Sequence, residues 1–225
     1  MKNKILIILL ICFISCKTDP NKITNKKKSE KQVSVDTAFI DEHTGDTIVA
    51  DTFHLKNNYK LIIFPALDKG KKVINFRIVK EKKDNTYLLT DTFDSPYIPI
   101  YQGNDFKKYF VLHASFGTHN SYFWLYDKET GEEVFTGIGM DFDLKNELIL
   151  YADEDDDYKF FIYDVNSKAK TLITIPSDLM DKQECTKYND SYKTIYIKSV
   201  SKEYYYLGFR YCPSKIEFKV KKVKQ

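Results

Sequence analysis

Short apolar runs separated by polar turns make up most of the chain. From Val35 onward, stretches rich in Tyr, Phe, Ile, Val and Thr alternate with polar segments, a pattern typical of antiparallel β-strands joined by tight turns. Asp68-Lys69-Gly70 and Lys83-Asp84-Asn85 are among the expected turns. Long helical periodicity is absent, and only 178–184, after Pro176-Ser177, favours a short helix. The sequence therefore predicts an all-β protein of about 12–13 short strands. The expected strands are 47–54, 59–64, 73–80, 86–90, 109–114, 122–127, 132–136, 147–151, 159–164, 170–175, 194–199, 204–211 and 215–219.

One part of this strand pattern repeats along the chain. When residues 110–136 are shifted by 37 positions, Phe123-Trp124-Leu125-Tyr126-Asp127 falls on Phe160-Phe161-Ile162-Tyr163-Asp164. The same shift places Val111-Leu112 on Leu148-Ile149. Each copy has a strand, a polar loop, an aromatic strand ending in Tyr-Asp, a turn and a further strand, which resembles a β-propeller blade. The resemblance implies an antiparallel meander with propeller-like stacking, and a β-sandwich or a barrel is the alternative.

The N-terminus has the layout of a targeting signal. Lys2 and Lys4 precede the apolar run Ile5–Ile14, which is about half the roughly 20 residues that a membrane-spanning helix needs. A secretory signal peptide has this layout. The end of the run, Phe13-Ile14-Ser15-Cys16, resembles a bacterial lipobox. The resemblance implies cleavage before Cys16, a diacylglycerol on its thiol and a second acyl group, such as palmitate, on the new amine. The alternative is an ordinary secreted protein in which this cysteine is incidental.

The expected organisation has four parts. Residues 1–15 are the signal peptide, 16–34 the lipidated cysteine with a Lys-rich tether, 35–219 a single β domain and 220–225 a basic tail. The tether has almost no apolar side chains to bury, so we expect it to be disordered. Two or more acyl chains anchor a protein stably, so the expected partner is a membrane. Lys17 follows the cysteine where some inner-membrane lipoproteins have Asp, and this resemblance implies the outer membrane.

Charge mainly excludes one class of partner. The formal net charge is +3, and lysine outnumbers arginine 33 to 2. Arginine side chains, which bind a phosphate or a base edge through two hydrogen bonds, are therefore nearly absent. Residues 34–218 contain 23 basic and 30 acidic residues, a net charge of −7. This sign opposes binding to a phosphate backbone, and we expect no nucleic-acid partner.

Two cysteines remain in the expected mature domain, Cys185 and Cys212. Export leads to an oxidising compartment, where disulfides form and persist. We therefore expect a disulfide between these two residues, and two separate buried thiols are the alternative.

An acidic run centres on Asp153-Glu154-Asp155-Asp156-Asp157. Hard carboxylate ligands at Asp153, Asp155 and Asp157 suit Ca²⁺, but an EF-hand loop would need glycine where Tyr158 stands. A solvated hairpin turn is the simpler interpretation, and a calcium site is the alternative. No other cofactor is expected.

Candidates for catalysis are few. His113 and His119 flank a short loop that contains Ser115, yet a third metal ligand and a nucleophile elbow are both missing from the sequence. No phosphate-binding loop or dinucleotide fingerprint occurs. A pocket that joins Asp141 or Asp143 to His113 would favour an envelope hydrolase.

Tyrosines along 204–211 suggest a binding face. Tyr204, Tyr206 and Arg210 share one face of the expected strand, while the alternate positions face the core. Tyrosine and arginine on a flat sheet suit a glycan or a peptide, although a sheet packed on both faces is the alternative. The sequence thus favours a lipid-anchored envelope protein whose non-catalytic β domain displays a binding surface for a glycan, peptide or protein. An envelope hydrolase with an acidic or histidine-containing site is the alternative.

Overall fold

The computed structural model describes residues 38–41, 44–91, 98–115, 121–182, 194–210, 212 and 216–223. All of them belong to one compact unit, Val33–Gln225. The expected signal peptide, Cys16 and the tether lie outside the described residues.

Sixteen strands form within the described part of the chain, with two short 3₁₀ turns and one helix. All strand pairs are antiparallel, which confirms the all-β antiparallel fold. The strands are β1 (Phe39–Ile40), β2 (Thr47–Ile48), β3 (Asp51–Leu55), β4 (Tyr59–Asp68), β5 (Lys71–Lys80), β6 (Lys83–Thr90), β7 (Ile100–Asp105), β8 (Tyr109–Ser115), β9 (Ser121–Asp127), β10 (Glu133–Asp143), β11 (Leu148–Asp153), β12 (Lys159–Asp164), β13 (Lys170–Ile173), β14 (Ile195–Val200), β15 (Tyr204–Phe209) and β16 (Glu217–Lys221). The 3₁₀ turns are η1 (Lys56–Asn58) and η2 (Glu154–Asp156), and the helix is α1 (Ser177–Lys182).

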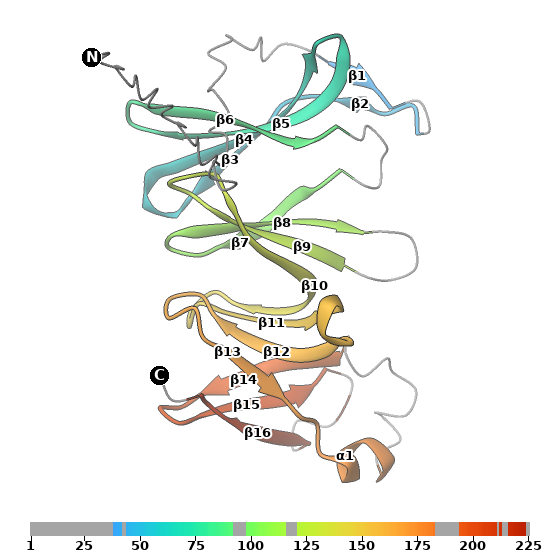
Figure 1. Cartoon of the computed structure of the whole chain (residues 1–225), viewed down its shortest axis with the longest axis vertical. Helices are drawn as coiled ribbons and strands as arrows, with labels where there is room; N and C mark the ends of the chain where they lie inside the picture. Colours follow the sequence, from blue (N-terminus) through green and yellow to red (C-terminus); the bar gives the residue numbers. More distant parts are fainter. Residues whose placement is uncertain are drawn as a thin grey trace, which may run out of the picture. The chain divides into compact units, whose positions relative to one another are not determined.

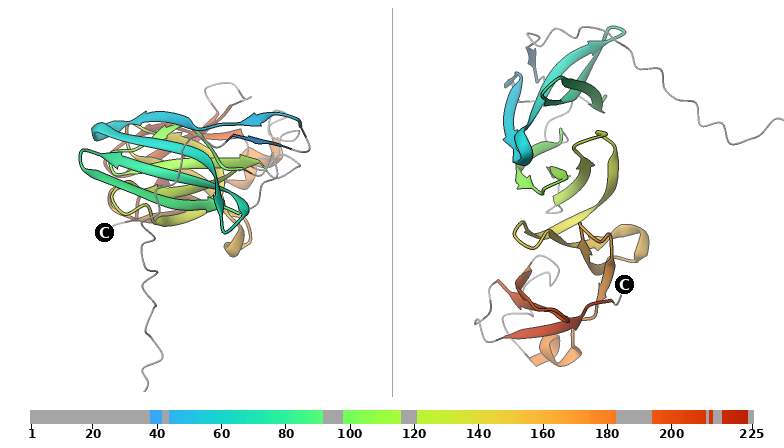
Figure 2. Two further views of the ribbon diagram at one scale, coloured as in Figure 1. Left: turned by 90° about the horizontal axis from the view of Figure 1, so that it is seen from above. Right: turned by 90° about the vertical axis from the view of Figure 1, so that its left-hand side faces the viewer.

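The strands form a succession of sheets, none of which closes into a barrel among the described residues. The sheets are β1-β2, β3-β4-β5-β6, the seven-stranded β7-β8-β9-β10-β11-β12-β13, and β14-β15-β16. Figure 1 shows them following one another from β3–β6 to β14–β16, and the right-hand view of Figure 2 shows the same order from the side. The long strand β10 pairs with β9 through its first half and with β11 through its second half. It therefore belongs to two successive four-stranded layers.

Three apolar cores lie between these layers. The first core joins the β3–β6 sheet to β8 and β9, for example through Leu61 and Phe110. The second lies between β8–β9 and β11–β12, and the third joins β11–β13 to β14–β16. Successive sheets thus pack face to face, as propeller blades do.

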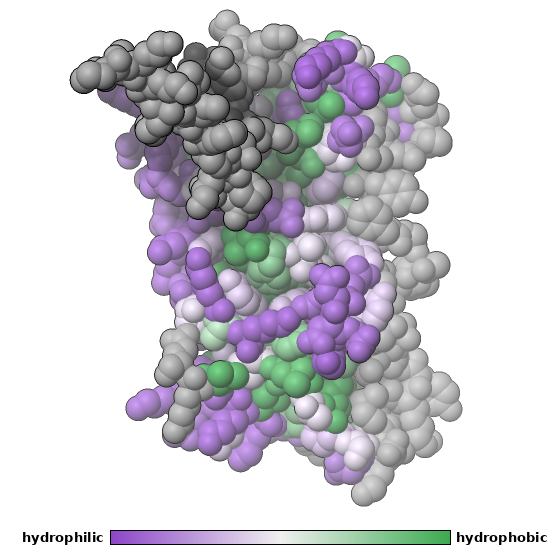
Figure 3. Space-filling view, in the orientation of Figure 1, coloured by the Kyte–Doolittle hydropathy of each residue, from purple (hydrophilic) through white to green (hydrophobic). Residues whose placement is uncertain are grey.

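The central strands are apolar on both faces because both faces are covered. In β11, Ile149 belongs to the second core and Leu150 to the third. Strand β8 is divided in the same way, with Val111 in the second core and Leu112 in the first. A strand between two packed layers needs a continuous apolar run rather than an alternating one. On the molecular face drawn in Figure 3, by contrast, hydrophobic and hydrophilic residues are interspersed.

The repeat in the sequence corresponds to a structural repeat, but its alignment is wrong in one strand. Asp127 and Asp164 end β9 and β12 and are true counterparts, since each accepts two backbone N–H groups of the turn that follows. Val111 pairs with Leu125, whereas the counterpart of Leu125, Ile162, pairs with Leu150. Val111 therefore corresponds to Leu150 and not to Leu148.

The cause of this offset is a longer connection before β11. Four residues separate the paired Asp105 and Phe110, and six separate their counterparts Phe142 and Ile149. A shift of two residues keeps each side chain on the same face of its strand, so the hydrophobic pattern is unchanged. Sequence matching without gaps could not detect it.

Several element boundaries also differ from the expected ones. The turn expected at 83–85 is wrong: Lys80 pairs with Lys83, so the hairpin turns at Glu81, which has φ of 54°, and at Lys82. The turn at Asp68-Lys69-Gly70 is confirmed, with positive φ at its last two residues. Strands β1 and β7 and the second half of β10 were not expected. The short helix after Pro176 is confirmed as α1.

Candidate functional site

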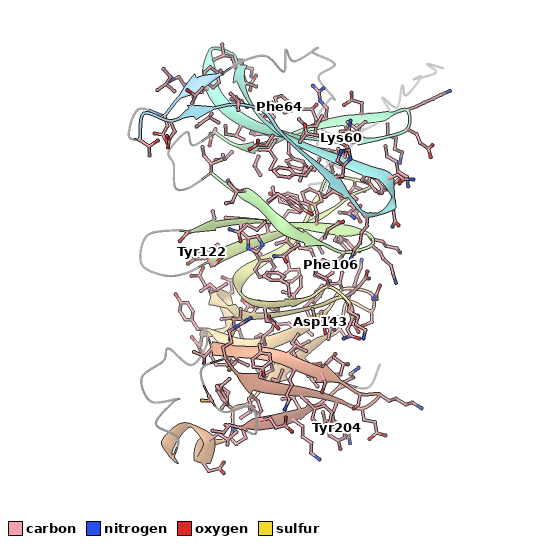
Figure 4. All side chains as sticks on the ribbon, turned by 180° about the vertical axis from the view of Figure 1, so that it is seen from behind. Lys60, Phe64, Phe106, Tyr122, Asp143 and Tyr204 are labelled. Carbon is pink, nitrogen blue, oxygen red and sulfur yellow. The ribbon has the colours of Figure 1, made fainter. Side chains whose placement is uncertain are left out.

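A cavity of about 660 Å³ lies between the first two layers. Its lining comes from the β1–β2 hairpin, from β3, β4 and β5 in the first sheet, and from β7, β8 and the start of β9. Phe64 in the first sheet, labelled in Figure 4, is one of its wall residues. A volume of roughly 300–1,000 Å³ is usual for small-molecule sites.

Most of the cavity wall is apolar. Phe53, Ile63 and Tyr101 line it and also pack against the first core. The cavity therefore lies next to the first core, in the part of the space between the two sheets that the core side chains do not fill. Val49 and Ile100 also line it and are 54% and 52% exposed. Apolar side chains that are half exposed beside a cavity are available to cover a ligand.

His113 is a buried polar side chain in this wall. It is 3% exposed, and its Nε2 lies 2.8 Å from the side-chain nitrogen Nδ2 of Asn104. Its ring also makes an edge contact with Phe142. Burial lowers the pKa of His113 to about 4, so the imidazole is neutral at pH 7.

The charged groups of the lining are carboxylates. Asp41, Asp46 and Asp51 contribute to the wall, and no lysine or arginine is among the described residues that line it. Asp41 is buried and accepts a hydrogen bond from the backbone N–H of Thr44. Asp46 and Asp51 are exposed. Tyr101 stays protonated, because burial and, secondarily, Asp105 raise its pKa to about 12.

Asp141 and Asp143 do not join His113 in this cavity. Asp141 forms an ion pair of 2.6 Å with Arg210 and accepts the backbone N–H of Ile197, so it links β10 to the last sheet. Asp143, labelled in Figure 4, accepts hydrogen bonds within the turn before β11. The pocket that would have favoured the hydrolase alternative is therefore not formed by these residues, and that alternative stays a prediction. His119 lies outside the described residues.

The acidic run forms the connection between β11 and β12. Asp153 accepts the backbone N–H of Asp155 and pairs with Lys170 at 2.5 Å. Asp157 is exposed and adopts a left-handed conformation at the end of η2. Within the ranges that the structure describes, no group of three or more His, Cys, Asp or Glu side chains is arranged to hold a metal ion. The hairpin interpretation fits this geometry, and calcium binding stays a prediction.

The tyrosine face on β15 has the alternation that the sequence predicted. Tyr205 is buried in the third core, while Tyr204 and Tyr206 on the opposite face are partly exposed. Lys219 lies over the Tyr204 ring at 4.9 Å, and Figure 4 shows Tyr204 in the last sheet. Arg210 is not free for a ligand, because it is paired with Asp141. Glycan or peptide binding at this face stays a prediction.

Cys212 takes part in a disulfide bond. Cys185 lies outside the described residues, so the pairing of the two stays a prediction. In the described part of the chain, no helix has both the length and the apolar character needed to cross a membrane.

The cavity was missed at the level of sequence. Its walls come from strands far apart in the chain, and two of these, β1 and β7, were not expected from the sequence. His113 and Ser115 are the lining residues to which the sequence pointed, because both belong to the short stretch from His113 to His119. Comparison with known proteins adds no identity, since no protein-family model, curated protein or solved structure matches the chain.

Proposed function

We propose that this chain is a lipid-anchored protein of the bacterial cell envelope, held at the outer membrane through Cys16. Its β domain binds a ligand without catalysis. The lipobox-like end of the signal sequence and the Lys-rich tether support the anchor. The domain follows the tether, which leaves the ligand site accessible outside the cytoplasm.

The observation that carries the binding role is the cavity between the first two layers. It is large enough for a small molecule, its wall is mostly apolar, and its buried histidine is neutral at pH 7. The Nε2 of His113 lies against Asn104, and neither Asp141 nor Asp143 lines the cavity. This arrangement favours holding a molecule with an apolar body.

A cavity-filling substitution tests the proposal. Ile100→Trp places a large side chain at a half-exposed position of the cavity wall, and Leu172→Trp adds the same side chain at a strand position that is 48% exposed and outside the lining. We expect 4-phenylbutanol to bind the full-length Cys16→Ser chain and the Leu172→Trp control with equal affinity. Ile100→Trp should weaken binding at least tenfold in isothermal titration calorimetry. Equal binding by both tryptophan variants would refute the cavity as the site.

A further inference from the structure

The charged side chains that line the cavity are all carboxylates. The exposed carboxylates of Asp46 and Asp51 belong to the lining, and the described lining residues include no lysine or arginine to balance them. Among the described residues, neither carboxylate accepts a hydrogen bond or forms an ion pair. Elsewhere in the domain, the Asp156 carboxylate is paired with Lys159.

Arg77 lies beside one wall residue, with its guanidinium 5.1 Å from the centre of the Phe64 ring, and it pairs with Asp84. His113 is neutral at pH 7, because burial lowers its pKa to about 4.

We infer that the cavity takes a small organic cation, an ammonium group carried on an apolar body. This inference rests on the proposed binding function. The apolar body lies against Phe53, Ile63 and Tyr101, and the ammonium group lies near Asp46 and Asp51 at the cavity wall. An anionic ligand would meet unbalanced negative charge there, so the same site discriminates against it.

Three probes with one apolar body and different head groups test this inference. The probes are 4-phenylbutylamine, 4-phenylbutanol and 4-phenylbutyrate, titrated at pH 7 and low salt into the full-length Cys16→Ser chain. Exposed ion pairs contribute up to about 1 kcal/mol each. With two carboxylates we expect the amine to bind about tenfold more tightly than the alcohol, and the carboxylate probe to bind most weakly. Added salt should reduce the preference for the amine.

Matched charge variants identify the responsible groups. Asp46→Asn/Asp51→Asn should lower the affinity for the amine to that for the alcohol and leave the alcohol unchanged. Asp68→Asn/Asp91→Asn removes the same charge from exposed positions outside the lining and should leave both affinities unchanged.

The outcomes separate this inference from the proposed function. If the alcohol binds but the amine binds no more tightly, or if the control variant loses the preference as well, the cation inference is wrong and the cavity remains a binding site. If none of the three probes binds, the proposed function fails and the inference fails with it.

Discussion

The buried ion pair between Lys128 and Asp105 gives the sharpest test of how the first two layers are held together. The Lys128 ammonium lies 2.5 Å from Oδ1 of Asp105, 2.7 Å from the carbonyl oxygen of Phe106 and 3.3 Å from that of Lys56. The other carboxylate oxygen of Asp105 accepts the backbone N–H of Lys56 at 2.5 Å. The pair thus joins the turn after β3 to the turns of the second layer. The side chains are 1% and 10% exposed.

The cost of breaking this pair follows from its burial. Lys128→Met keeps the apolar stem but leaves the Asp105 carboxylate buried without its cation, which typically costs about 3–5 kcal/mol. Burial lowers the pKa of Lys128, although Asp105 opposes the shift. The attraction between the two charges therefore offsets only part of the free energy of hydration that they lose on burial. Replacing both partners should therefore recover part of the stability, and Asp105→Asn/Lys128→Met should cost about 1–3 kcal/mol.

The next layer shows that apolar side chains can occupy these positions. The counterparts of Asp105 and Lys128 are Phe142 and Val165, which belong to the second core. Urea unfolding followed by the fluorescence of the single tryptophan, Trp124, measures the effect. With an m-value of about 2 kcal/mol per molar urea, Lys128→Met should lower the midpoint by about 2 M. The reasoning would be contradicted if Lys128→Met lowered the free energy of unfolding by less than about 1 kcal/mol. It would also be contradicted if Asp105→Asn/Lys128→Met were as unstable as Lys128→Met alone.

Three further predictions concern a turn, a histidine and the anchor. A Cβ added at Gly131, where φ is 69°, would lie 2.2 Å from the Tyr87 ring, whereas Gly70 also has a positive φ but has open space around it. In urea unfolding, Gly131→Ala should therefore lower the free energy of unfolding by at least about 1 kcal/mol more than Gly70→Ala does. Equal losses in the two variants would contradict this. The pKa of His113 in the folded state lies below its value in the unfolded state. The stability that the neutral, buried ring contributes is therefore fully present above about pH 6.5 and is lost as the pH falls toward 4. Over this pH range, the free energy of unfolding of the wild type should fall by about 3 kcal/mol more than that of His113→Gln. If the free energies of unfolding of the two proteins change in parallel with pH, the burial argument is refuted. Cys16→Ser should move the protein from the membrane to the soluble fraction, whereas a variant that stays with the membrane would show that the anchor lies elsewhere.

The strand content could be predicted because its causes are local. The alternation of Tyr204 and Tyr206 with Tyr205 identifies the exposed and the core face of β15 without knowledge of any partner strand. The turns after Asp127 and Asp164 could also be predicted, because a carboxylate that accepts N–H groups two and three residues later needs only neighbouring residues.

The environments of Lys128 and Asp141 could not be predicted from the sequence, because they depend on contacts with residues far away in the chain. Lys128 lies in a turn, where a lysine is normally solvated, and it is buried only because the loop of Asp105 and the end of β3 close over it. Asp141 was a candidate for a hydrolase site, but the last sheet supplies Arg210, which forms an ion pair with it.

By itself, then, the sequence determined an antiparallel all-β domain with a two-layer repeat, because period-two patterns and short turns act between neighbours. Only the tertiary structure decided which faces meet, that one strand is offset by two residues from its apparent counterpart, and that a cavity remains where the first core ends. Packing between layers depends on the volumes and shapes of side chains that come together from distant strands, and these cannot be derived from the pattern of residues within one strand.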